Sequence, residues 1–144
     1  MISIFSEDCL PADQNYRIMS IQELKAIFLH VVKDNYCNFE GRASRYEYWW
    51  FVLINFIIDC AASVLDSWIG LAICSGIVSL ALLLPGLGLA VRRLHDINRS
   101  GWWILLAAIP VLGWIVLLVW AAQKSDESAN DFGEVPTDDY AKAA

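Results

Sequence analysis

Three long stretches of this chain are almost without charge, and they constrain its fold more than any other feature. Residues 49–65 contain one charged side chain, Asp59, and residues 68–91 and 101–123 contain none. A helix needs roughly 20 mainly apolar residues to cross about 30 Å of hydrocarbon. Three such helices, with one charged side chain among them, would be unusual in a soluble domain of 144 residues. The sequence therefore predicts an all-α membrane protein whose three transmembrane helices cover about 47–65, 69–91 and 102–122.

The rest of the chain divides around this membrane domain, which we place at residues 37–122. Residues 1–19 are predicted to form a flexible leader, and residues 123–144 an acidic polar tail. Between the leader and the membrane domain, residues 20–36 carry apolar side chains at helical spacing behind a capping box of Ser20 and Glu23. This pattern predicts an amphipathic interfacial helix that either lies on the lipid surface or packs against the protein.

Basic residues in the short connections predict the orientation of the spans. Arg42 and Arg45 precede the first span, a second basic group lies between the second and third spans, and the turn between the first two spans has neither Lys nor Arg. Both groups should then face the cytosol, together with the N-terminus. Three spans would put the C-terminus on the opposite side. The alternative is that Pro110 and Gly113 fold the third segment into a re-entrant hairpin.

Composition argues against several function classes. The formal net charge of -6 arises mainly in the tail, and no basic patch interleaved with aromatic residues is large enough to predict binding of nucleic acid. The cysteines form no C-x-x-C pair and lack zinc-ligand spacing. We therefore expect free thiols, no metal site and no cofactor. These cysteines are Cys9, Cys37, Cys60 and Cys74.

A polar stripe runs along the first predicted span. Asn55, Asp59 and Ser63 recur every four residues and share one helical face. A charge near the middle of a bilayer costs roughly 2.5–3.5 kcal/mol on insertion scales, so this face should meet protein or water. One interpretation is an ion or proton site in an oligomeric transporter or channel. The other is a neutral carboxyl that holds helices together, with Ser75, Gly76, Ser79 and Trp114 as its expected neighbours.

The densest polar cluster follows the second predicted span. It consists of Arg92, Arg93, His95, Asp96 and Arg99, in which helical spacing predicts an Arg92–Asp96 pair. With Arg42 and Arg45 it forms a candidate site for anionic headgroups or a membrane partner. An acid–base role for His95 and Asp96 is disfavoured because adjacent residues rarely face each other on a helix. A further interpretation is that these arginines only determine topology.

The sequence resembles a known bacterial inner-membrane family, domain of unknown function 805, which comprises the YhaH-like inner membrane proteins. The resemblance covers roughly residues 31–137 and implies a small helical membrane protein without an established activity. It also implies that three motifs form the site of interest. They are Phe39-x-Gly41-Arg42-Ala43-Ser44-Arg45-x-Glu47-Tyr48-Trp49, Arg92-Arg93-Leu94-His95-Asp96-x-x-Arg99-Ser100-Gly101-Trp102-Trp103, and Asn130-x-Phe132-Gly133.

No nucleophile–base pair or metal-ligand set is evident, so no catalytic residue is expected. The sequence favours a non-enzymatic scaffold, or a component that binds lipid or a membrane partner through a basic cytosolic face. Self-association into a homo-oligomer is compatible with this interpretation. The alternative is a small oligomeric transporter or channel subunit that uses the Asn55, Asp59 and Ser63 stripe.

Overall fold

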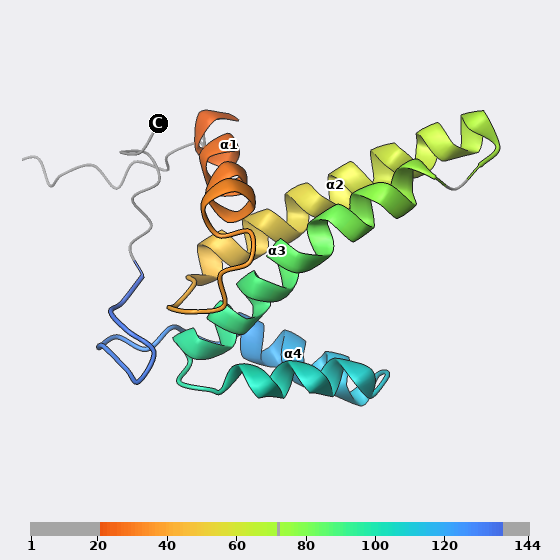
Figure 1. The fold of residues 1–144 in the computed structure, drawn as a ribbon. Helices are drawn as coiled ribbons and strands as arrows, with labels where there is room; N and C mark the ends of the chain where they lie inside the picture. Colours follow the sequence, from red (N-terminus) through yellow and green to blue (C-terminus); the bar gives the residue numbers. More distant parts are fainter. Residues whose placement is uncertain (1–20, 72, 137–144) are drawn as a thin grey trace, which may run out of the picture.

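Two long antiparallel helices dominate the structure, a computed structural model that describes residues 21–71 and 73–136. They are α2 (Arg45–Ile69) and α3 (Cys74–Asp96), which lie side by side along their length (Figure 1). At about 1.5 Å per residue each is about 35 Å long, enough to cross the hydrocarbon of a bilayer. The described residues form helices and no strand, in agreement with the predicted all-α class. The leader, Ser20, Cys9 and the end of the tail after residue 136 lie outside the described residues.

Helix α2 begins and ends at residues whose side chains stabilise helix termini. Ser44 caps the start of the helix, because its Oγ accepts a hydrogen bond of 3.1 Å from the Glu47 amide. At the far end Gly70 adopts a left-handed conformation, with φ at 76°, and stops the helix. Asp66 lies in the last turn of α2 and accepts hydrogen bonds from the amides of Cys74 and Ser75. The carboxylate of one helix therefore caps the start of the next.

The amphipathic segment forms α1 (Ile21–Leu29) and a π-helical turn, η1 (His30–Asp34), and it packs against the protein. Ile27 and Val31 are fully buried, and the ring of Phe28 stacks on Phe51 of α2 at a centroid distance of 5.9 Å. Figure 1 shows α1 crossing α2 near the start of that helix. One face of α1 therefore packs against the protein, as one of the two interpretations predicted. Ile21 at the start of α1 remains 72% exposed.

The third apolar segment is not one continuous helix, which corrects the prediction of a single span over 102–122. It folds into the 3-10 helix η2 (Gly101–Ala108) and the helix α4 (Leu112–Ala122), joined by a sharp turn. At Val111, with φ at 67°, the chain reverses in a γ-turn in which the Leu112 amide donates to the Pro110 carbonyl over 2.9 Å. This short hairpin diverges from the α2–α3 pair, starting from a common end (Figure 1).

Helix α3 extends beyond the residue where the sequence predicts a loop. The loop was expected from Arg92, yet the helix continues to Asp96. It ends in a Schellman motif, in which the Arg99 amide donates to the Leu94 carbonyl and Asn98 takes the left-handed conformation at φ 54°. The extra turn directs Arg92, Arg93 and Asp96 inward, and all three are buried.

The segment after α4 folds back over the end of α3. The Asp126 amide donates to the Asp96 carbonyl over 3.2 Å, and the Asn130 side chain donates to the His95 carbonyl over 2.9 Å. Residues 123–136 therefore lie at the same end of the molecule as both arginine groups. A continuous third helix would place them at the opposite end of the molecule.

Candidate functional site: a buried arginine–aspartate cluster

The polar base is the end of the molecule where α2 begins and α3 ends, and we define it as residues 41–47, 92–99 and 121–133. Its centre is Asp96, whose side chain is fully buried between two arginines. Arg42 donates to Asp96 Oδ1 from Nε over 3.0 Å and approaches it with Nη2 at 2.9 Å. Arg93 pairs with the other carboxylate oxygen from the preceding turn of α3. The carboxylate thus joins two arginines that are 51 residues apart.

The remaining donors of Arg42 hold the tail. Its Nη1 donates to the Ser128 carbonyl and its Nη2 to the Asp126 carbonyl, each over 2.7 Å. A further hydrogen bond of 3.4 Å reaches the carbonyl of Gly133. Charge-assisted hydrogen bonds of this kind are about twice as strong as neutral ones. Arg42 is therefore an anchor for the backbone of residues 126–133.

Arg93 anchors the end of α4 in the same way. Its Nε donates to the Ala121 carbonyl over 3.0 Å, and its Nη2 donates to the carbonyl of Gln123. These carbonyls lie at the C-terminus of a helix, where backbone acceptors lack intrahelical partners and the helix dipole attracts a cation. Arg93 thus caps α4 and fixes the short hairpin to α3.

Arg92 is the remaining buried arginine of the polar base, and its partner differs from the predicted one. Arg92 does not contact Asp96 but donates to Glu47 Oε1 of α2 over 3.3 Å, with both side chains at most 5% exposed. The predicted i,i+4 pair is wrong because Arg93, at i,i+3, and Arg42 occupy the Asp96 carboxylate. Arg92 Nε has no hydrogen-bond partner among the described residues. Glu47 is a residue of the base whose pairing the sequence did not reveal.

The tail motif packs on His95. The Phe132 ring stacks on the imidazole at a centroid distance of 4.0 Å and an interplanar angle of 4°. His95 Nδ1 lies 3.1 Å from the Gly41 carbonyl, and because a carbonyl only accepts, that nitrogen carries a proton. Asn130 stabilises the local turn through its Oδ1, which accepts from the Phe132 amide over 3.0 Å. His95 and Asp96 therefore have separate partners and do not form an acid–base pair.

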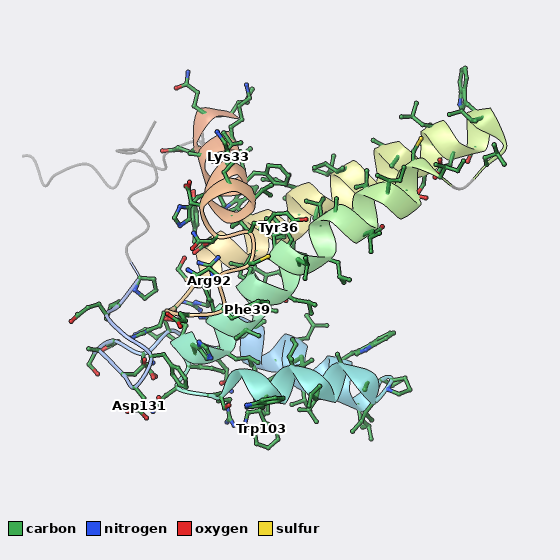
Figure 2. All side chains as sticks on the ribbon, in the orientation of Figure 1. Lys33, Tyr36, Phe39, Arg92, Trp103 and Asp131 are labelled. Atoms are coloured by element: carbon green, nitrogen blue, oxygen red, sulfur yellow. The ribbon has the colours of Figure 1, made fainter. Side chains whose placement is uncertain are left out.

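Among the predicted binding residues, Arg45 and Arg99 remain accessible. Arg45 is exposed at the first turn of α2, and the Arg99 guanidinium lies over the Trp120 ring at 4.2 Å from its centroid. Figure 2 shows Arg92 within the crowded base, Trp103 near the start of the short hairpin and Asp131 at the edge of the tail. The structure brings the three motifs of the family resemblance together, but it places most of their charged side chains in the interior.

The outer face of the tail is acidic and solvated. Glu127 accepts from Lys124, and this contact lowers the pKa of the Glu127 carboxyl. Both side chains are at least 70% exposed, so the pair contributes little to stability. No cluster of three or more His, Cys, Asp or Glu residues suited to a metal ion occurs in the described part of the chain. Cys37, Cys60 and Cys74 are free thiols.

The polar stripe of α2 lies apart from the base. Ser79 of α3 is confirmed as a neighbour of Asp59, since its Oγ donates to the carboxylate over 3.3 Å. Two of the other expected neighbours have different partners: Ser75 binds Asp66, and the Trp114 indole donates to the Ala107 carbonyl. Asn55 Oδ1 is buried without a partner among the described residues.

The matches to known proteins cover the part of the chain that contains the polar base. The sequence profile of a family described as "Protein of unknown function (DUF805)" matches residues 36–134. The chain is 45% identical over 111 residues to inner membrane protein YhaI of Escherichia coli K12, an alignment that covers 76% of this chain and 93% of the relative. It is 39% identical over 115 residues to inner membrane protein YhaH of the same strain, with 76% and 94% covered. No solved structure matches the chain.

Proposed function

This chain belongs to the DUF805 family of bacterial inner-membrane proteins, and from that membership we propose that it is a non-enzymatic component that binds anionic lipid at its cytosolic face. The observation that carries the proposal is that the arginines fall into two groups, one buried and one accessible. Arg42, Arg92 and Arg93 are buried and hold the polar base together, whereas Arg45 and Arg99 stay accessible beside aromatic side chains. Accessible arginines flanked by tryptophan and tyrosine suit the headgroup region of a bilayer.

The proposal includes a topology of two crossings and one re-entrant hairpin. With about 2.0 Å per residue in η2 and about 1.5 Å in α4, each arm of the hairpin is about 16 Å long, half the hydrocarbon thickness. The start of α2 and the end of α3, which carry the arginines, then face the cytosol together with the tail. The acidic tail covers the outer surface of the base, away from lipid.

The tip of the hairpin is suited to a dry environment. A non-helical backbone in hydrocarbon must satisfy its hydrogen-bonding groups within the protein. Pro110 has no amide hydrogen, the Gly113 amide donates to the Ile109 carbonyl over 3.1 Å, and the Trp114 indole donates to the Ala107 carbonyl over 3.0 Å. These contacts support insertion of the tip into lipid.

Lipid selectivity tests the proposed function. Purified full-length protein in a neutral detergent is mixed with equal amounts of phosphatidylglycerol and phosphatidylcholine that carry the same acyl chains, and retained lipid is counted by native mass spectrometry. At about 1 kcal/mol per accessible arginine, the exposed Arg45 and the half-buried Arg99 should favour the anionic lipid by at least about tenfold at low salt. The preference should shrink as salt screens the charges. Equal retention of the two lipids would refute the proposed function.

A further inference from the structure

A groove at the polar base differs in chemistry from the buried cluster beneath it. It has a volume of about 530 Å³ and opens where the first turns of α2 meet the residues that follow α4. Pockets of roughly 300–1,000 Å³ are typical of sites for small molecules. The lining residues are Ser44, Arg45, Tyr46, Trp49, Trp50, Ala122 and Ser125.

The lining offers hydrogen-bond donors and one positive charge, and it contains no carboxylate. Arg45 has no hydrogen bond or ion pair with any described residue, so its guanidinium is available to an anion. Trp49 and Trp50 also line the groove, and an indole N–H can only donate. The charge and the donors of the groove therefore complement an anion with several acceptor oxygens, and an arginine fork fits phosphate in particular.

The same groove has an apolar wall, which selects an anion attached to hydrocarbon. Tyr46 and Trp50 contact edge to face at 6.2 Å between ring centroids, and the exposed Trp49 continues that wall along α2. Tyrosine and tryptophan rings favour the level of lipid headgroups. A free phosphate ion would leave this aromatic surface uncovered, whereas the glycerol and first methylenes of a phospholipid would cover it.

On the basis of the proposed function, we propose that this groove is a specific site for the phosphate of an anionic phospholipid, completed by the docked tail. Ala122 and Ser125 come from the segment that Arg93 fixes, and Ser125 Oγ itself accepts a hydrogen bond from Arg93 over 3.3 Å. The buried cluster thus builds one wall of the site without touching the lipid. Arg45 supplies the phosphate contact.

The test compares Arg45→Gln with Lys33→Gln in the full-length protein, because both remove one exposed positive charge and only Arg45 lines the groove. Retention of short-chain phosphatidylglycerol and phosphatidylcholine is measured by native mass spectrometry. A charged hydrogen bond is worth about 1.5–3 kcal/mol, so Arg45→Gln should weaken phosphatidylglycerol binding by about tenfold or more. Lys33→Gln should bind as the wild type does, and Arg45→Lys, which keeps the charge but not the fork, should lose part of the affinity.

Three results would overturn the site. Equal loss in Arg45→Gln and Lys33→Gln would mean attraction by general charge, and displacement of the lipid by excess inorganic phosphate would mean a site for the free ion. Unchanged binding in Arg45→Gln, with the wild type still preferring phosphatidylglycerol, would reject the groove but leave the proposed function standing. That function falls only if the wild type itself shows no preference.

Discussion

Replacing Asp96 by asparagine should destabilise the protein by about 3–5 kcal/mol and release the tail from the polar base. The side chain keeps its size, but Arg42 and Arg93 lose the negative charge that compensates both of them in the interior. Breaking a buried ion pair by neutralising one partner leaves an uncompensated buried charge, and this is the source of the cost. The measurement is the free energy of unfolding in detergent, accompanied by limited trypsin digestion at Lys124 to follow the tail.

Asp131→Asn is the matched control, because Asp131 is exposed on the same tail and makes no ion pair with a described residue. It should change stability by less than about 0.5 kcal/mol. A double-mutant cycle of Arg42→Met with Asp96→Asn should show strong coupling between the two sites. Additive effects, or an Asp96→Asn variant as stable as Asp131→Asn, would contradict a structural role for the cluster.

Gly113→Ala should have the second large effect, a loss of about 3 kcal/mol in unfolding free energy. A Cβ atom at Gly113 would lie 1.7 Å from the Leu106 carbonyl oxygen, which is backbone and cannot rotate away. The two arms of the hairpin would have to separate, and overpacking of this kind typically costs 1–3 kcal/mol or more.

Gly76→Ala provides the control for this substitution. A Cβ at Gly76 meets no atom within 4 Å, and alanine is favoured over glycine within a helix by roughly 0.8–1.0 kcal/mol. Thermal or denaturant unfolding of the two variants in the same detergent should therefore shift in opposite directions. Similar behaviour of the two would show that the arms of the hairpin do not approach closely at Gly113.

The sequence correctly predicted the helices whose formation depends on residues close together in the chain. The two long apolar segments were visible in the sequence, since hydropathy depends on neighbouring residues. Hydropathy alone does not distinguish a continuous span from a hairpin, because both are uncharged. The structure forms a hairpin around Pro110 and Gly113, and the sequence indicated this hairpin only as the alternative to a continuous span.

The partners of the charged residues could not be predicted in the same way. Helical spacing offered Arg92 as the partner of Asp96, whereas the structure uses Arg93 and also Arg42, which is 54 positions away. Non-local pairing depends on how the loop before α2 crosses α3 at Gly88, where the Asn38 carbonyl leaves no room for a Cβ. The tail contributes mainly backbone carbonyls to Arg42 and Arg93, and side-chain chemistry does not reveal them. The resemblance to a family at Asn130, Phe132 and Gly133 was the one signal that the tail belongs to the site.

Side-specific cysteine labelling tests most directly whether the tail shares one membrane face with the arginines. Single cysteines replace Lys33, Trp68 or Glu134 in a chain without its four native cysteines, and an impermeant maleimide is added to spheroplasts or to inside-out vesicles. Positions 33 and 134 should react in inside-out vesicles, and position 68, beside the α2–α3 turn, should react in spheroplasts. Labelling of position 134 together with position 68 would contradict the re-entrant hairpin and restore three full crossings.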